Sequence, residues 1–233
     1  MDGIGPVTSS VAQLQNQRTG ILWLFFGSGR YFFEQSGTTD DADGQRRLFG
    51  IKEPCFSSSG LDTSCTSTVN IGTLTNVTSV GSVPLESTAN SASFDGWYIN
   101  LESSGNYTYT EGGTPVARGY KAERDITDPL ATTAGLVFFT TYKPYGDECG
   151  IGGKSFIWAM RYNTGGSGGT LLKGTALLQV STGSIEQVNL SQALTEMGGR
   201  RTSALEGVPP TAQGLSILSP PPPVKRTVHI KER

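Results

Sequence analysis

The sequence predicts an all-β protein organised like a β-propeller, as a partial or small propeller with long polar loops. Three observations support this: aromatic strand segments recur along the chain, Gly-rich turns separate them, and charged residues make up only 16%. Glycine accounts for 31 of the 233 residues, well above the roughly 7% of average usage. Low charge with abundant Gly, Ser and Thr is typical of extracellular all-β proteins with many turns.

The clearest strand pair is Leu136–Tyr142 and Ser155–Tyr162. Both segments are rich in aromatic and β-branched residues and are bounded by Gly, Pro or Asp. The connector KPYGDECGIGGK joins them, and the second segment ends in an aromatic residue followed by a Gly-Gly stop. A strand, a Gly-rich connector and a second strand of this kind are typical of a propeller blade.

Weaker apolar runs before this pair predict further strands. In chain order they are Ile21–Phe26, Arg30–Phe33, Arg47–Ile51, Trp97–Leu101, Tyr107–Tyr109 and Val116–Lys121. Gly27-Ser28-Gly29 interrupts the first two, and no helix pattern follows it, so it indicates a strand break rather than a phosphate-binding loop. Residues 55–93 form a Ser/Thr/Gly/Asn tract, which we expect to be a loop insertion less ordered than the rest.

The C-terminal part predicts a hairpin and a closing strand. Thr175–Val180 and Ile185–Leu190 flank STGS, a hairpin signal. Residues 191–223 are polar and Pro-rich and are expected to be mostly loop, apart from helix-like spacing over Gln187–Met197. Residues 224–233 alternate, and we expect them to form a strand that closes an earlier blade or binds a partner chain through Val224, Val228 and Ile230. The whole chain, 1–233, is expected to be one domain of about four blades.

The three cysteines predict one local disulfide. Cys55 and Cys65 lie ten residues apart in a polar loop, where a disulfide would restrain a flexible segment. Cys149 is left over and is either free or paired with a second chain.

The sequence carries little that suggests catalysis, and we expect a protein that is not an enzyme. The only histidine, His229, lies in the closing strand, and no nucleophile elbow, zinc-protease motif or P-loop occurs. Acidic groups at Glu123, Asp125 and Asp128 are expected to be surface loop residues rather than general acids or bases. Trp23, Trp97 and Trp158 lie inside strand patterns, which favours core packing over stacking on a sugar.

Composition also excludes two classes of partner. The net charge is −2, so no basic surface is expected to bind nucleic acid. No apolar run approaches the ~20 residues of a membrane-spanning helix, so no transmembrane segment is expected.

A family resemblance emerges from these segments. ILWLFFGSGRYF, DGQRRLFGIKE and GWYINL, followed by the block from Thr127 to Gly166, resemble in content and order the C-terminal propeller of the PilY/PilC type IV pilus tip proteins. The resemblance covers most of residues 15–166, and the 127–166 block carries most of its specificity. Family members are larger, with an N-terminal adhesive region and more blades, so this chain resembles only their last part.

The resemblance implies an extracellular protein at a pilus tip that supports pilus assembly and adhesion. The implied partners are minor pilins or the remaining portion of a split tip protein. Two other functions stay open: a fragment of a propeller-type quinone-dependent dehydrogenase, and a bare interaction module on another extracellular filament.

Family members also carry a calcium loop of the EF-hand type. The nearest stretch here is Thr39–Gly44, in which Asp41 and Asp43 fit the third and fifth positions of such a loop. Thr39 stands at the first position and Gly50 at the twelfth, where the strongest ligands would be expected. Calcium bound by Asp41 and Asp43 is therefore the one cofactor that the resemblance implies.

Overall fold

The structure is a computed structural model that describes residues 4–31, 34–35, 38–39, 44–146, 152–207 and 209–218. Strands make up 46% of it and helices 9%, so the predicted all-β class is confirmed. No helix among these residues has the length and apolar character needed to cross a lipid bilayer.

The first sheet has five strands in the spatial order β1-β2-β5-β9-β8. Their bounds are β1 (Ala12–Gln15), β2 (Leu22–Gly27), β5 (Arg47–Lys52), β8 (Thr75–Asn76) and β9 (Gly96–Asn100). Strands β1, β2, β5 and β9 follow one another in chain order and are antiparallel, whereas β8 joins the edge in parallel.

The second sheet is built on the two strands that the sequence indicates most clearly. Its order is β12-β14-β15-β19-β18, with β13 also paired to β14 and β20 to β15. The bounds are β12 (Arg124–Asp125), β13 (Leu130–Ala131), β14 (Leu136–Pro144), β15 (Gly153–Arg161), β18 (Leu194–Glu196), β19 (Arg201–Thr202) and β20 (Leu205–Gly207). Nearly every residue of β14 and β15 is buried, because both faces of this sheet are covered.

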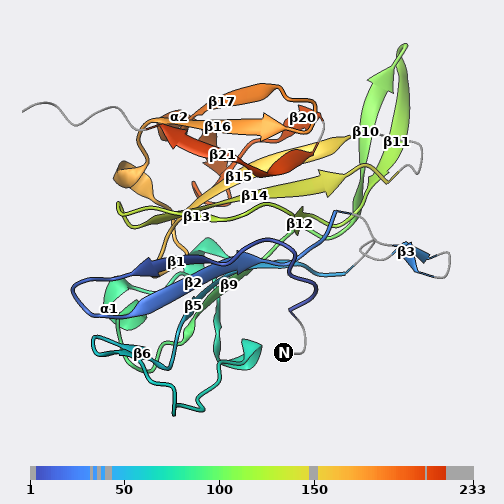
Figure 1. The fold of residues 1–233 in the computed structure, drawn as a ribbon. Coiled ribbons are helices and arrows are strands. Elements are labelled where there is room, and N and C mark those ends of the chain that lie inside the picture. Colours follow the sequence, from blue (N-terminus) through green and yellow to red (C-terminus); the bar gives the residue numbers. More distant parts are fainter. Residues whose placement is uncertain are drawn as a thin grey trace, which may run out of the picture.

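The third sheet has the order β17-β16-β21, with β16 (Thr175–Val180), β17 (Ile185–Asn189) and β21 (Pro210–Leu218). The three sheets lie in layers, with the second between the first and the third (Figure 1). The described strands leave these sheets open, and no propeller or closed sheet is identified in this part of the chain.

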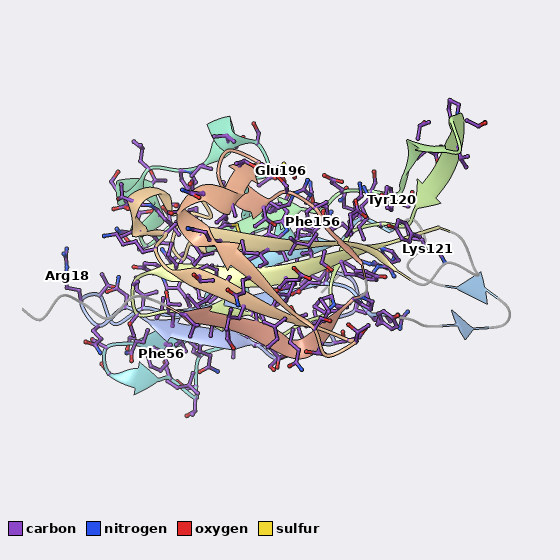
Figure 2. The ribbon with its side chains drawn as sticks, turned by 90° about the horizontal axis from the view of Figure 1, so that it is seen from above. Arg18, Phe56, Tyr120, Lys121, Phe156 and Glu196 are labelled. Atoms are coloured by element: carbon purple, nitrogen blue, oxygen red, sulfur yellow. A yellow bond between two sulfur atoms is a disulfide. The ribbon has the colours of Figure 1, made fainter. Side chains whose placement is uncertain are left out.

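Three hairpins lie outside the layers. The longest, β10 (Gly105–Glu111) with β11 (Thr114–Tyr120), turns at Gly112 and Gly113 and projects from one end of the stack (Figures 1 and 2). The others are β3 (Glu34–Gln35) with β4 (Thr38–Thr39), and β6 (Phe56–Ser57) with β7 (Gly60–Leu61). The Cys55–Cys65 disulfide encloses the last of these, as the sequence predicts.

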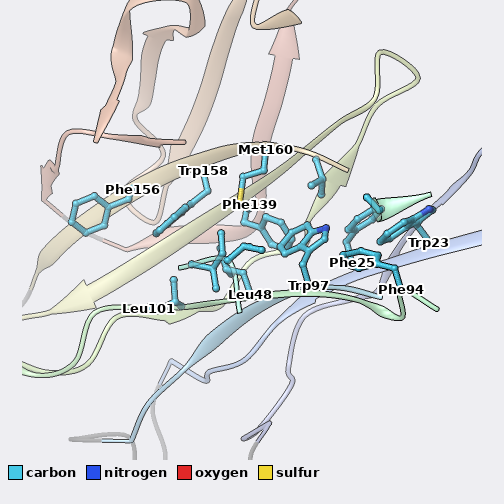
Figure 3. Close-up of a cluster of buried hydrophobic side chains, with 14 residues drawn as sticks. Trp23, Phe25, Leu48, Phe94, Trp97, Leu101, Phe139, Phe156, Trp158 and Met160 are labelled. Atoms are coloured by element: carbon cyan, nitrogen blue, oxygen red, sulfur yellow. The ribbon is translucent and has the colours of Figure 1, made fainter. Parts of the chain in front are cut away.

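The first and second sheets enclose an aromatic core (Figure 3). Its largest members are Trp23, Phe25, Trp97, Phe139 and Trp158, which all have exposed fractions of 2% or less. All three tryptophans are therefore core residues, as the sequence predicts. The indole N–H of Trp97 donates to the backbone oxygen of Tyr162 over 2.9 Å, so its polar atom is also satisfied.

The second and third sheets enclose a smaller, mainly aliphatic core. The second sheet contributes Phe138 and Ile157, which point away from the aromatic core because side chains alternate along a strand. Ala176, Leu178 and Val188 contribute from the third sheet. The central sheet thus holds the three layers together.

The tract over 55–93 is more than a loop insertion. Besides β6, β7 and β8 it contains the short helices η1 (Ile71–Thr73), η2 (Val80–Ser82) and α1 (Glu86–Ala89). Val77 and Ala89 are fully buried in the aromatic core. The buried Arg200 guanidinium donates to the backbone oxygens of Val77 over 2.6 Å and Thr78 over 2.7 Å, which anchors the tract.

The loop expected over 191–214 instead contains α2 (Leu190–Ala193, beginning one residue earlier), β18, β19, β20 and most of β21. Strand β21 pairs with β16, and Pro210 fits because a first strand residue can lack its N–H. Polar side chains are compatible here because β21 is an edge strand with one partner. Among the other predicted strands, Arg30–Phe33 finds no counterpart in the described part of the chain: Arg30 and Tyr31 are not in a strand, and residues 32–33 lie outside the described residues. The predicted closing strand over 224–233 also lies outside them.

Candidate functional site

A cluster of charged side chains occupies the end of the second sheet beside the β10–β11 hairpin. It borders a pocket of about 260 Å³ whose wall includes Glu102, Tyr120, Lys143, Phe156 and Arg201. In Figure 2, Tyr120 lies at the base of this hairpin, and Phe156 and Glu196 follow towards the middle of the molecule. Because so few residues of this chain are charged, this concentration is the first candidate for a functional site.

Arg201 is the centre of the cluster. Met197, Gly198 and Gly199 all have positive φ angles, and this tight turn leads directly into β19. Arg201 then lies opposite Trp158, with its guanidinium 4.2 Å from the centre of the Phe156 ring. Stacking on an aromatic ring leaves the planar N–H groups free to donate to carboxylates at the edge.

Three carboxylates surround this guanidinium. Arg201 donates to Glu123 over 3.0 Å, to Glu102 over 2.5 Å and to Glu196 over 2.7 Å. Lys143 lies 2.7 Å from Glu102 and supplies a second cation. The charges of the cluster are therefore largely neutralised by one another.

Glu123 is completely buried, and its two carboxylate oxygens accept hydrogen bonds from four donors. They are the Thr141 hydroxyl, the Trp158 indole, the Arg201 guanidinium and the backbone N–H of Glu102. Burial raises the pKa of Glu123, and Arg201 and Thr141 oppose that rise. An acceptor with four donors has the hydrogen bonding of an ionised carboxylate, so Glu123 and Arg201 form a buried ion pair.

Glu102 and Lys154 form the partly exposed rim of the pocket beside this charge cluster. Burial alone would raise the pKa of Glu102, but hydrogen bonds from Lys143 and Arg201 lower it below its usual value. The Lys154 ammonium lies 5.0 Å from the centre of the Tyr120 ring and 3.3 Å from Glu206. These contacts give the rim a polar surface beside an aromatic one.

A second buried acid, Asp125, lies at the contact between the first two sheets. A Cβ added at Gly27 would lie 2.0 Å from Asp125 Oδ2, so only glycine fits there. This oxygen has no hydrogen-bond partner among the described residues. Burial raises the pKa of Asp125 well above its usual value. The Gly27-Ser28-Gly29 strand break thus makes room for a buried carboxyl group.

These positions correct one prediction and leave others untested. Glu123 and Asp125 are buried between sheets rather than lying in surface loops, because β12 and the residue before it lie on the covered face of the second sheet. Asp41, Asp43, Cys149, Val224, Val228 and Ile230 all lie outside the described residues. Gly50, the twelfth position of the implied calcium loop, lies in β5 against Trp97. The described part of the chain contains no group of three or more His, Cys, Asp or Glu residues that could hold a metal ion.

Sequence reasoning missed Arg200 and Arg201, as well as the pairing of Glu102 with Lys143. One signal was available: two adjacent arginines directly after Met-Gly-Gly in a chain of low charge. Their partners could not be found, since Glu123 lies 78 residues away along the chain.

Comparison with known proteins finds no family model, no curated protein and no solved structure that matches this chain.

Proposed function

We propose that this chain is a non-catalytic structural and binding module of a type IV pilus tip, in which its sheets form part of a β-propeller completed by a partner chain. The supporting observation is the arrangement of the sheets, which pack face to face in three successive layers (Figure 1). Propeller blades are four-stranded antiparallel sheets that pack on their neighbours in the same way. The resemblance of residues 15–166 to the PilY/PilC propeller gives this arrangement its biological context.

Strand order within the layers supports the same proposal. In the first sheet the spatial neighbours β1, β2, β5 and β9 are arranged in the order in which they occur along the chain. The same holds in the second sheet for β12, β14, β15 and β19. All of these pairs are antiparallel. Four antiparallel strands in succession form the meander expected of a blade, with long insertions between some of the strands.

The outer face of the third sheet supports completion by a partner. Ile185 and Leu218 are 59% and 55% exposed, and they alternate with residues that face the second sheet. A further blade packed on this face would remove their apolar surface from water. Val224, Val228 and Ile230 follow shortly after Leu218 and are the proposed contacts of the closing strand.

The disulfide supports an extracellular location, because disulfides persist in oxidising compartments. The partners proposed are minor pilins or the rest of a split tip protein. Calcium held by Asp41 and Asp43 remains part of the proposal.

The test is co-expression with the minor pilins of a type IV pilus and affinity capture. The double substitution Ile185→Arg with Leu218→Arg places two charges on the outer face and should abolish capture. Leu61→Arg is the matched control, since Leu61 is 61% exposed on the separate β6–β7 hairpin, and it should leave capture unchanged.

Three results would count against the proposal. The first is that the unaltered chain captures no minor pilin, and the second is that both altered chains capture them equally well. The third is that deletion of residues 219–233 leaves a stable monomer with unchanged solubility and melting. Turnover of a redox dye on addition of quinone would favour the dehydrogenase instead.

A further inference from the structure

A second pocket lies at the opposite end of the β14–β15 pair from the charge cluster. Leu136 pairs with Arg161 at this end, whereas Lys143 pairs with Lys154 at the other. The pocket has a volume of about 280 Å³ and is formed by five separate segments. They are the turn after β1, helix α1 with the residue after it, the turn before β14, the end of β15 with the two residues after it, and Leu171 of the short helix η3 (Gly169–Leu171).

Contacts between the lining residues connect the walls of this pocket. Asn16 donates from its amide to the Tyr162 hydroxyl over 2.6 Å, and its amide oxygen accepts from the backbone N–H of Arg18 over 3.0 Å. Arg161 forms an ion pair with Glu86 of α1. The Tyr162 ring packs edge-on against Trp23, so this wall is continuous with the aromatic core.

Several polar groups of the pocket are unpaired. Asn163 is 6% exposed as a whole residue and lines the pocket, where its side-chain amide makes no hydrogen bond to the described residues. The side chains of Asn90 and Arg18, which are exposed, have none there either. The Asn163 side-chain atoms are not among the fully buried atoms that lack a partner, so this amide is reached from the pocket and can donate to and accept from a molecule there.

The unpaired groups define the chemistry of a ligand. Planar amides donate and accept in one plane, which suits adjacent hydroxyl groups, and an unpaired guanidinium suits a carboxylate. The Glu86 carboxylate is already paired with Arg161, so Arg18 leaves the pocket with an excess of positive charge. Ala134 and the 40%-exposed Leu171 add an apolar surface for the C–H face of a ring.

We propose that this pocket binds one carboxylated sugar unit, such as a hexuronate residue of a surface polysaccharide. The volume is at the small end of ligand pockets, which fits a single pyranose ring. In this arrangement Arg18 binds the carboxylate, Asn90 and Asn163 bind hydroxyl groups, and Leu171 contacts the ring. The proposal does not depend on a pilus partner, so each can fail without the other.

The test uses saturation-transfer NMR and titration calorimetry with D-galacturonate and D-glucuronate as probes. Galactose and glucose are the neutral comparison, and acetate and inorganic phosphate test for simple anion binding. At least one uronate should bind at about millimolar concentration, and its neutral counterpart about tenfold more weakly, because a charge-assisted contact is lost.

Variants separate the pocket from general charge effects. Arg18→Ala should weaken uronate binding about tenfold, and Asn163→Ala should weaken both the uronate and the neutral sugar. Lys121→Ala is the control, since it also removes one positive charge and lies at the other end of the molecule (Figure 2). Unchanged melting temperatures would show that the variants are folded.

Each remaining outcome would overturn the proposal. The proposal fails if neither uronate binds, if acetate or phosphate binds as tightly as the uronates, or if Arg18→Ala and Lys121→Ala weaken binding equally.

Discussion

The two ends of the β14–β15 pair differ in how their polar side chains are satisfied. At the charge cluster, Arg201 and Glu123 are buried and find all their partners within the protein. At the opposite pocket, Arg18 and Asn163 have no side-chain partner among the residues described. Paired buried charges contribute to a specific packing arrangement, whereas unpaired groups facing a pocket are available to a ligand. Substitutions at the two ends should therefore affect different properties, stability at one and binding at the other.

The largest effect should come from Arg201→Met. This substitution leaves Glu123 buried without its cation, which should lower the free energy of unfolding by about 3–5 kcal/mol. Denaturant unfolding of the single variant and of Arg201→Met with Glu123→Gln measures the coupling, and the second change should restore part of the loss. The control Glu206→Gln removes a more exposed charge and should cost under about 1 kcal/mol. A loss for Arg201→Met as small as that of the control would contradict the account of a buried ion pair.

Removal of the disulfide should have the next largest effect on stability, and it should also reach the pocket. Replacing Cys55 and Cys65 together by Ala should lower the free energy of unfolding by about 2–3 kcal/mol, since the closed loop is short. Ser58 of this loop lies directly against Gly20, so the turn that carries Arg18 should also lose support. Chemical denaturation and uronate titration measure both effects. A loss of stability with unchanged uronate binding would argue against this linkage.

Asp125 is a buried acid that differs from the fully paired residues of the charge cluster, because one of its carboxyl oxygens has no hydrogen-bond partner among the described residues. Its pKa is raised by burial, so the folded state holds the proton more tightly than the unfolded state. Stability is therefore greatest below the unfolded pKa of about 3.9 and falls as pH rises from there towards the folded pKa. The slope due to this group should be about 1.4 kcal/mol per pH unit.

Asp125→Asn tests this prediction, since the amide has a similar shape but cannot ionise. Calorimetric melting as a function of pH should give a shallower decline for this variant and higher stability near neutral pH. Asp128→Asn removes the same charge from a less buried position and should leave the decline in place. Equal pH profiles for the unaltered chain and Asp125→Asn would show that the folded state does not hold a proton on Asp125 more tightly than the unfolded state.

The smallest effect on stability should come from the pocket. Arg18→Ala and Asn90→Ala remove exposed side chains that make no hydrogen bond within the described structure, so each should change the free energy of unfolding by no more than about 0.5 kcal/mol. Thermal unfolding checks this directly. A loss of several kcal/mol would show that these side chains support the fold rather than a binding site.

The sequence by itself determined the local elements. Alternating aromatic residues located β2, β5, β9, β14 and β15, because strand periodicity and turn residues are written in neighbouring positions. The ten-residue separation of Cys55 and Cys65 was likewise enough to predict their disulfide.

Tertiary structure alone decided which faces met. The pairing of β21 with β16, the burial of Asp125 against Gly27 and the contact of Arg201 with Glu123 join residues distant in the chain. The proposed sugar pocket also combines five segments, from Asn16 to Leu171. Local patterns specify strands and turns, but the partner of a charged or unpaired side chain depends on sheet order and loop geometry, which short-range periodicity does not encode.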